Sequence, residues 1–107
     1  MIDKSFNLIE TIKSIESSSK DVREFVSAVA ESIVLTLNEL NRSYRVFTDW
    51  SVDPFESPIL VSVSVYIESN GLKAFVDKLY AEDLCRAIDE ERLISKCDRA
   101  YQMYFVN

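Results

Sequence analysis

The first forty positions of the chain carry apolar residues at helical spacing. Over residues 2–16 they recur at steps of three or four, with charged residues between them, which predicts an amphipathic helix. Asp21 and Glu24 have the spacing of a capping box, in which each side chain satisfies an unpaired backbone N–H at a helix start. A broad apolar stripe follows them, so we predict a central, largely buried second helix over residues 22–41.

Strict alternation of apolar and polar positions then replaces the helical period. Residues 44–50 alternate and are rich in β-branched and aromatic residues, which predicts a strand. In residues 59–68 valine and isoleucine occupy one side, while Leu60, two serines, Tyr66 and Glu68 occupy the other. This pattern predicts a second strand that is buried on one face only. Ser69, Asn70 and Gly71 are expected to end it.

The last third of the chain predicts a helix followed by a strand. The apolar residues that share helical spacing after Gly71 are Leu72, Phe75, Val76 and Leu79. The phase slips near residues 80–83, so this third helix either bends there or is followed by a short one over 84–88. Residues 100–107 lack helical spacing and predict a last strand. The order α-α-β-β-α-β implies an α+β domain with its helices on one face of a small three-stranded, mainly antiparallel sheet. The direction of the last strand stays open.

Length and composition indicate a single packed domain over residues 1–107. Hydrophobic residues make up 48% of the chain and charged residues 28%. The longest apolar run, residues 25–37, contains Glu31 and falls short of the roughly 20 residues that a membrane span requires. Without a signal-peptide pattern at the N-terminus, we expect a cytoplasmic protein that does not bind membranes. In that compartment Cys85 and Cys97 should remain free thiols.

The residue types argue against catalysis and against bound metals. The sequence contains no histidine, which removes the commonest general base near neutral pH and the usual nucleophile partners and metal ligands. The cysteines have no CxxC spacing, so we expect neither metal nor cofactor. The acidic clusters at 82–83 and 89–91 are typical of a solvated surface. A carboxylate-dependent enzyme is therefore the last of three alternatives.

The negative charge is concentrated in one segment. The net charge is −6, and residues 46–72 contain four acids and no lysine or arginine. An acidic protein of this kind is poorly suited to nucleic acid, whose binding depends on cations. The segment includes TDWSVDPFESP, residues 48–58, which we expect to be a connection stiffened by two prolines. Its aromatic and acidic side chains would suit a partner with an apolar pocket rimmed by lysine and arginine.

Two further interpretations of these surfaces stay open. Trp50 and Phe55 are also explained if they fold back to cap the core, with the acids keeping the connection soluble. The serine and tyrosine face of the second strand is a second binding candidate, which residues of the last strand would extend. If residues 100–107 form a sheet edge, they contain no lysine or proline to block pairing with another chain. That edge would then allow a homodimer.

Together these features favour a small acidic, non-catalytic module that binds another protein. The expected partner has a basic surface, such as that of a nuclease or a nucleic-acid-binding protein, which the module would mask as an inhibitor. Immunity proteins and phage-encoded inhibitors have a similar size and charge. The candidate partner-binding residues are Asp49, Trp50, Asp53, Phe55, Glu56 and Tyr66. The main alternative is a structural subunit that forms oligomers through an open sheet face or edge.

Overall fold

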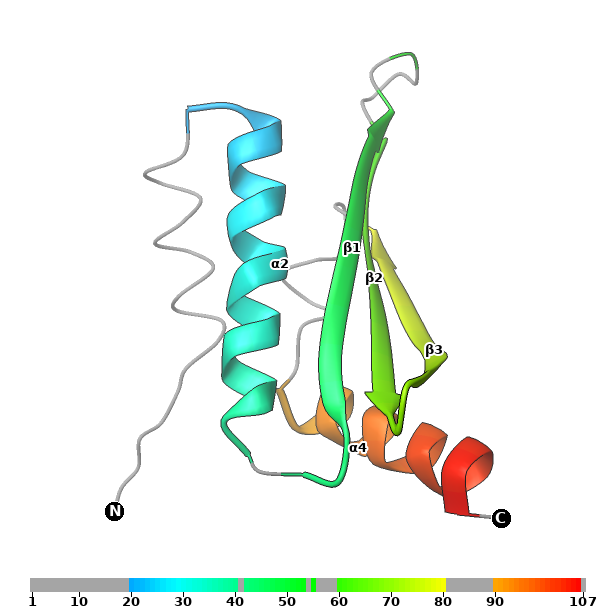
Figure 1. Ribbon diagram of the computed structural model, residues 1–107. Helices are drawn as coiled ribbons and strands as arrows, with labels where there is room; N and C mark the ends of the chain where they lie inside the picture. Colours follow the sequence, from blue (N-terminus) through cyan, green and yellow to red (C-terminus); the bar gives the residue numbers. More distant parts are fainter. Residues whose placement is uncertain (1–19, 41, 54, 56–59, 81–89, 107) are drawn as a thin grey trace.

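The computed structural model describes residues 20–40, 42–53, 55, 60–80 and 90–106 (Figure 1). Its elements are α2 (Val22–Asn38), β1 (Arg45–Asp53), β2 (Leu60–Ser69), β3 (Leu72–Tyr80), α4 (Glu90–Tyr101) and a π-helical segment, η2 (Gln102–Val106). The fold belongs to the α+β class, as predicted. The helix expected over residues 2–16 lies outside the described residues.

The helix α2 has the start that the sequence predicts. The Asp21 carboxylate accepts a hydrogen bond from the Glu24 N–H at 2.9 Å, and the Glu24 carboxylate accepts one from the Lys20 N–H at 2.6 Å. The helix ends at Asn38, whose side-chain amide bonds both backbone groups of Val46 at 2.7 and 3.0 Å. This pair of bonds ends α2 slightly earlier than expected and fixes its C-terminal end to the start of β1.

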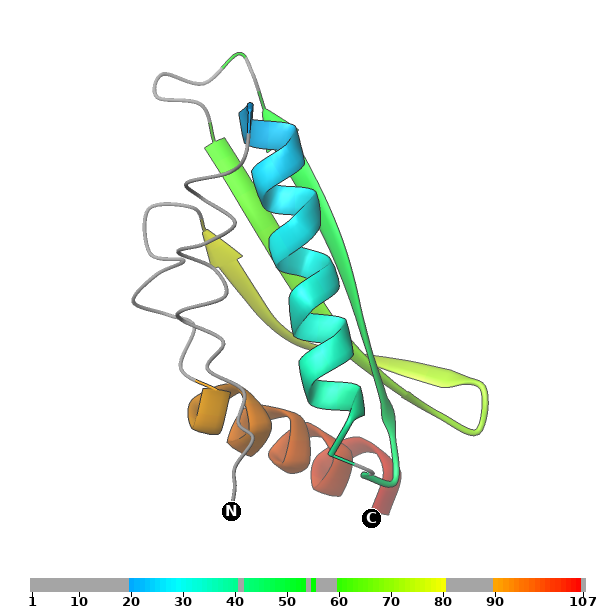
Figure 2. The same cartoon turned by 90° about the vertical axis from the view of Figure 1, so that its left-hand side faces the viewer.

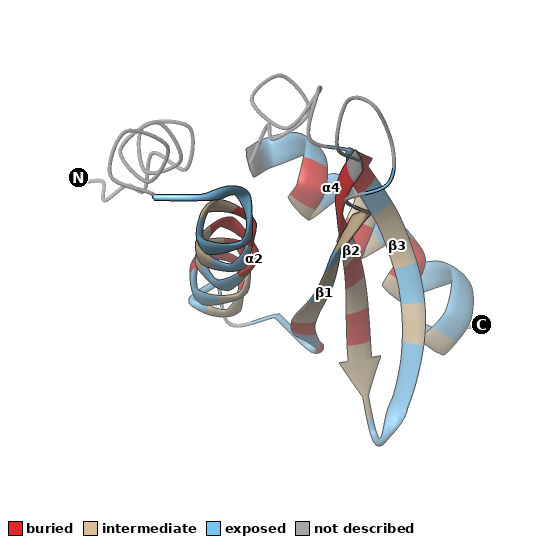
Figure 3. Cartoon of the chain, turned by 90° about the horizontal axis from the view of Figure 1, so that it is seen from above, coloured by how far each residue is buried: buried red, intermediate tan, exposed pale blue. Residues whose placement is uncertain are grey.

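The sheet is an antiparallel meander with the order β1-β2-β3. The inward-facing residues of β2 are all buried: Val61, Val63, Val65 and Ile67. The helix α2 packs over β1 and β2, and α4 packs against β3 and β2, so both helices cover the same face (Figures 1 and 2). Buried positions gather between the sheet and these two helices (Figure 3). This arrangement confirms the prediction of helices on one face of a three-stranded sheet.

The third strand is not the segment that the pattern indicated. Residues 72–80 form β3 instead of a helix, and Asn70 and Gly71 make the two-residue turn before it, with φ values of 54° and 82°. Two successive positive φ values are those of the tight hairpin turn that Asn-Gly favours. In β3, Val76 is an extra residue in a bulge, because Phe75 pairs with Tyr66 and Asp77 with Val65. The bulge shifts the alternation by one position and so imitates helical spacing.

The last segment is helical, so the predicted strand over residues 100–107 is wrong. The helix α4 buries Leu93, Cys97 and Ala100 at steps of four and three, and η2 continues the chain to Val106. The Tyr101 and Phe105 rings, four residues apart, stack at 5.6 Å. Tyr101, Tyr104 and Phe105 do have helical spacing, but the aromatic and β-branched content of the segment favoured a strand. The homodimer edge expected here does not exist in that form. The free edges of the described sheet are β1 and β3.

The turn between β2 and β3 gives a test of this correction. A Cβ at position 71 would meet no atom within 4 Å, so Gly71→Ala carries only the backbone cost of a positive φ. We expect a loss of about 1–2 kcal/mol in the free energy of unfolding, measured by urea denaturation. Asn70→Gly, the matched change, should alter stability by less than about 0.5 kcal/mol. An unchanged or increased stability in Gly71→Ala would contradict the hairpin.

Candidate functional site

Trp50 lies in β1 and faces the helices. It pairs across the sheet with buried Val63 and packs against the hydrophobic core. Two residues earlier on the same side of the strand, the Thr48 hydroxyl donates a hydrogen bond to the Ala30 carbonyl of α2 at 3.2 Å. The tryptophan therefore fills space between sheet and helix, which is the core-capping role that the sequence left open.

Phe55 has the opposite environment, with 94% of its surface exposed. The Asp53 carboxylate accepts a hydrogen bond from the Phe55 N–H at 3.0 Å, which holds the backbone just after the end of β1. Asp49 and Asp53 lie on the side of β1 away from the helices, and the Asp49 carboxylate accepts from the Trp50 N–H at 2.9 Å. This end of the sheet thus combines an exposed ring with the Asp53 carboxylate, while Asp49 lies at the middle of β1, opposite Ser64. Glu56, the third predicted acid, lies outside the described residues.

Tyr66 belongs to a different surface, the outer face of the sheet. Phe47, Tyr66 and Phe75 form a row across the three strands, and the Tyr66 and Phe75 rings meet edge to face at 5.7 Å. The Arg45 guanidinium and the Lys73 ammonium lie 5.5 and 5.4 Å from the centre of the Phe47 ring. The structure therefore separates Tyr66 from the acidic end and places it in an aromatic row with cations around it.

A third surface, which the sequence analysis missed, lies between β3 and the C-terminal helix. Two shallow hollows, of about 290 and 360 Å³, share Phe75 and Tyr104 in their walls. We call this pair the β3–η2 groove; its other apolar wall residues include Leu72, Val76, Met103 and Phe105. Lys96 and Arg99 also line it. The groove was missed because the sequence pattern placed residues 72–80 in a helix and 100–107 in a strand.

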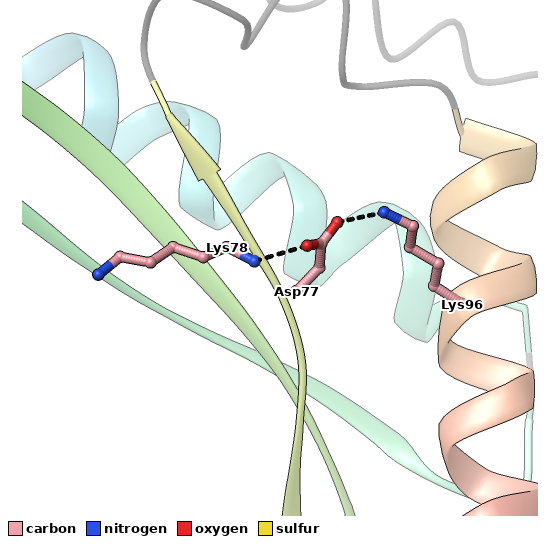
Figure 4. A network of polar contacts seen from close by, with 3 residues as sticks. All are labelled: Asp77, Lys78 and Lys96. Atoms are coloured by element: carbon pink, nitrogen blue, oxygen red, sulfur yellow. Dashed lines mark hydrogen bonds and ion pairs between the residues drawn. The ribbon is translucent and has the colours of Figure 1, made fainter.

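Two polar contacts fix α4 beside the sheet. The Lys96 ammonium lies 2.6 Å from one Asp77 carboxylate oxygen, and the other oxygen accepts from the Lys78 N–H at 2.9 Å (Figure 4). Two residues further along α4, the Asp98 carboxylate accepts a hydrogen bond from the Tyr44 hydroxyl at 2.5 Å. Because each contact joins α4 to a strand or to its start, the walls of the groove are held in place on both sides.

Burial shifts the titration of two groups in this region. The pKa of the Cys97 thiol rises from 9.0 to about 12, mainly because the side chain is buried and also because the Asp98 carboxylate is nearby. Burial, followed by the hydrogen bond to Asp98, raises the pKa of the Tyr44 hydroxyl above its ordinary value of 10.0. Cys97 is a free thiol. A buried thiol with a raised pKa is a poor nucleophile, so Cys97 has a packing role.

Comparisons with known proteins give no further guide to the site. The sequence matches no protein family, and neither curated proteins nor solved structures are significantly similar to it. Across residues 20–40, 42–53, 55, 60–80 and 90–106, no three metal-binding side chains come together. In the same ranges, neither helix has the length and apolar character to cross a membrane. The binding surfaces must be judged on their own chemistry.

Cys97 gives a test of the packing around α4. Its thiol keeps its proton in the folded state and loses it more easily in the unfolded state, so its contribution to stability is complete below about pH 9 and is lost as the pH rises toward 12. In that window its share of the free energy of unfolding should fall by about 1.4 kcal/mol per pH unit. Urea denaturation at several pH values should show that the free energy of unfolding decreases less between pH 9 and pH 12 for Cys97→Ala than for the wild type. Parallel declines would contradict the buried thiol.

Proposed function

We propose that this protein is a non-catalytic module that binds another protein through the end of its β1–β2 hairpin. The observation that supports this most strongly is the exposure of Phe55, because 94% of its surface is open to solvent beside the Asp53 carboxylate. A folded chain gains nothing from an aromatic side chain in water. Aromatic side chains, phenylalanine among them, are enriched in protein interfaces relative to the rest of the protein surface.

The charge around Phe55 specifies the kind of partner. Asp49 and Asp53 lie on the outer side of β1, and the sequence from 46 to 72 contains no cation. Carboxylates at the margin of an interface attract a positively charged partner and speed its approach. The partner surface that fits is an apolar pocket large enough for a phenyl ring, with lysine or arginine at its rim. A nuclease or another nucleic-acid-binding protein has such a surface, and the module would act by covering it.

The outer face of the sheet supports a second candidate function, assembly into oligomers. Its row of Phe47, Tyr66 and Phe75 lies on the face away from α2 and α4, although Phe75 also borders η2 in the β3–η2 groove. Aromatic rows with adjacent cations are suited to contacts with another protein surface. Phe47 and Tyr66 are half-buried, however, and the cations over Phe47 already occupy one of the rings. For this reason we place the principal contact at Phe55.

The role of Phe55 can be measured with a basic protein captured from the source cells on immobilised wild-type chain, identified by mass spectrometry and then purified. Phe55→Ser should weaken its binding by at least about 2 kcal/mol, or roughly thirtyfold, chiefly through faster dissociation. Leu35→Ser is the matched control, because Leu35 is also exposed, at 61%, but lies on α2. The measurement is surface plasmon resonance, with thermal denaturation to confirm that both variants remain folded.

The carboxylates should affect a different step of the same binding reaction. Asp49→Asn combined with Asp53→Asn should slow association and flatten its dependence on salt, since charges at a rim steer more than they hold. The amide oxygen at position 53 can still accept the Phe55 N–H, so the backbone geometry is kept. Equal affinities for the wild type, Phe55→Ser and the amide variant would show that the hairpin end is not the binding site.

A further inference from the structure

The β3–η2 groove has the properties required of a partner for Phe55. Two hollows of about 290 and 360 Å³ lie side by side, because they share the Phe75 and Tyr104 side chains. Their volumes are at the lower end of the range for ligand pockets, roughly 300–1,000 Å³, which suits a single aromatic side chain. Phe75 and Tyr104 are 52% and 64% exposed, so the aromatic walls are accessible.

The charge of the groove is opposite to that of the hairpin end. Lys73, Lys96 and Arg99 line the two hollows, and no described residue that lines them is acidic. Lys96 shares its charge with Asp77, and Lys73 extends over Phe47, so exposed Arg99 is the cation most available to an incoming carboxylate. In a chain of net charge −6, this corner gathers cations around an apolar surface.

The two surfaces lie at opposite ends of the molecule. The arrowhead of β1 points to one end of the sheet, whereas the β2–β3 turn, η2 and the C-terminus lie at the other (Figure 1). A chain therefore cannot place its own Phe55 in its own groove. A second copy can, and such a contact joins the head of one molecule to the tail of the next.

We propose that the β3–η2 groove binds the hairpin end of a second copy of this chain, with Phe55 between Phe75 and Tyr104 and with Asp53 facing Arg99. The inference rests on the proposed function, because it names a partner for the same hairpin end. A contact between two different surfaces of one molecule is heterologous, so it produces rings or open chains instead of a symmetric dimer. Self-association would also cover the exposed Phe55 until a better partner displaces it.

The test uses two variants that each lose one of the two surfaces. Phe55→Ser removes the ring from the hairpin end, and Arg99→Glu with Tyr104→Ser removes the cation and the ring from the groove. All three side chains are exposed, so the fold should survive, and thermal denaturation checks this. Sedimentation velocity should show wild-type assemblies that grow with protein concentration and shrink with added salt. Each variant alone should remain at the 12.3 kDa chain mass over a concentration range at least tenfold wider.

The mixture of the two variants tests directly whether the hairpin end binds the groove. Phe55→Ser keeps an intact groove and the groove variant keeps an intact hairpin end, so one productive contact can form between them. The mixture should give a complex of twice the 12.3 kDa chain mass. This complex should not grow further, because the hairpin end and the groove that remain free in it are the mutated ones. Leu35→Ser should assemble like the wild type.

Three results would overturn the inference. A wild-type chain that is monomeric at millimolar concentration has no such contact, and the proposed function survives if a captured basic protein still binds in a Phe55-dependent way. Assembly that persists in Phe55→Ser would place the contact on another surface, such as the outer face of the sheet. Variants that are monomeric alone and remain monomeric when mixed would show that the hairpin end and the groove do not bind one another.

Discussion

The row of buried side chains on the inner face of β2 is the constraint on which the rest of the structure depends. Val61, Val63, Val65 and Ile67 are each at most 4% exposed, and both helices pack against this single face. Burying one such side chain contributes roughly 1.5–3 kcal/mol, so this row accounts for a large share of the core. Because only two helices are described and both lie on this side, the outer face of the sheet and its ends are left for other contacts.

The β3–η2 groove forms because α4 packs beside β3, at the edge of the sheet opposite β1. The helix buries Leu93, Cys97 and Ala100 against the core, and the Lys96–Asp77 and Tyr44–Asp98 contacts set its position. The chain then continues as η2, where Met103 and Tyr104 border β3 in the groove and are more than half exposed. The contacts that hold α4 against the core therefore also place exposed aromatic side chains beside Phe75, at the end of the molecule opposite Phe55.

The sequence predicts secondary structure correctly in the segments where one hydrophobic pattern, either helical or alternating, continues without interruption. The capping residues Asp21 and Glu24 and the clean alternation in 59–68 mark α2 and β2 correctly, because local geometry and burial require the same pattern there. The bulge at Val76 adds one residue to β3, and a period-2 pattern with one insertion resembles a period near 3.6. The Asn70-Gly71 pair was the signal that could have identified the hairpin.

The candidate site was predictable in its composition but not in its geometry. The acidic segment and its two aromatic residues follow from the sequence, which left open whether Phe55 is exposed. The inward direction of Trp50 depends on the register of β1 against β2. Nothing local fixes that register. The groove was beyond prediction for a related reason, since it joins residues from β3 and η2, two segments whose secondary structure was assigned incorrectly.

The contact made by position 55 can be observed directly with a photo-reactive side chain. Replacement Phe55→p-benzoylphenylalanine keeps an aromatic ring at the exposed position, and irradiation of a mixture of isotope-labelled and unlabelled chains identifies links between copies by mass spectrometry. The account predicts links from position 55 of one copy to Met103, Tyr104 or Phe75 of another. Links to α2 or to the outer face of the sheet, or no links between copies at millimolar concentration, would contradict it.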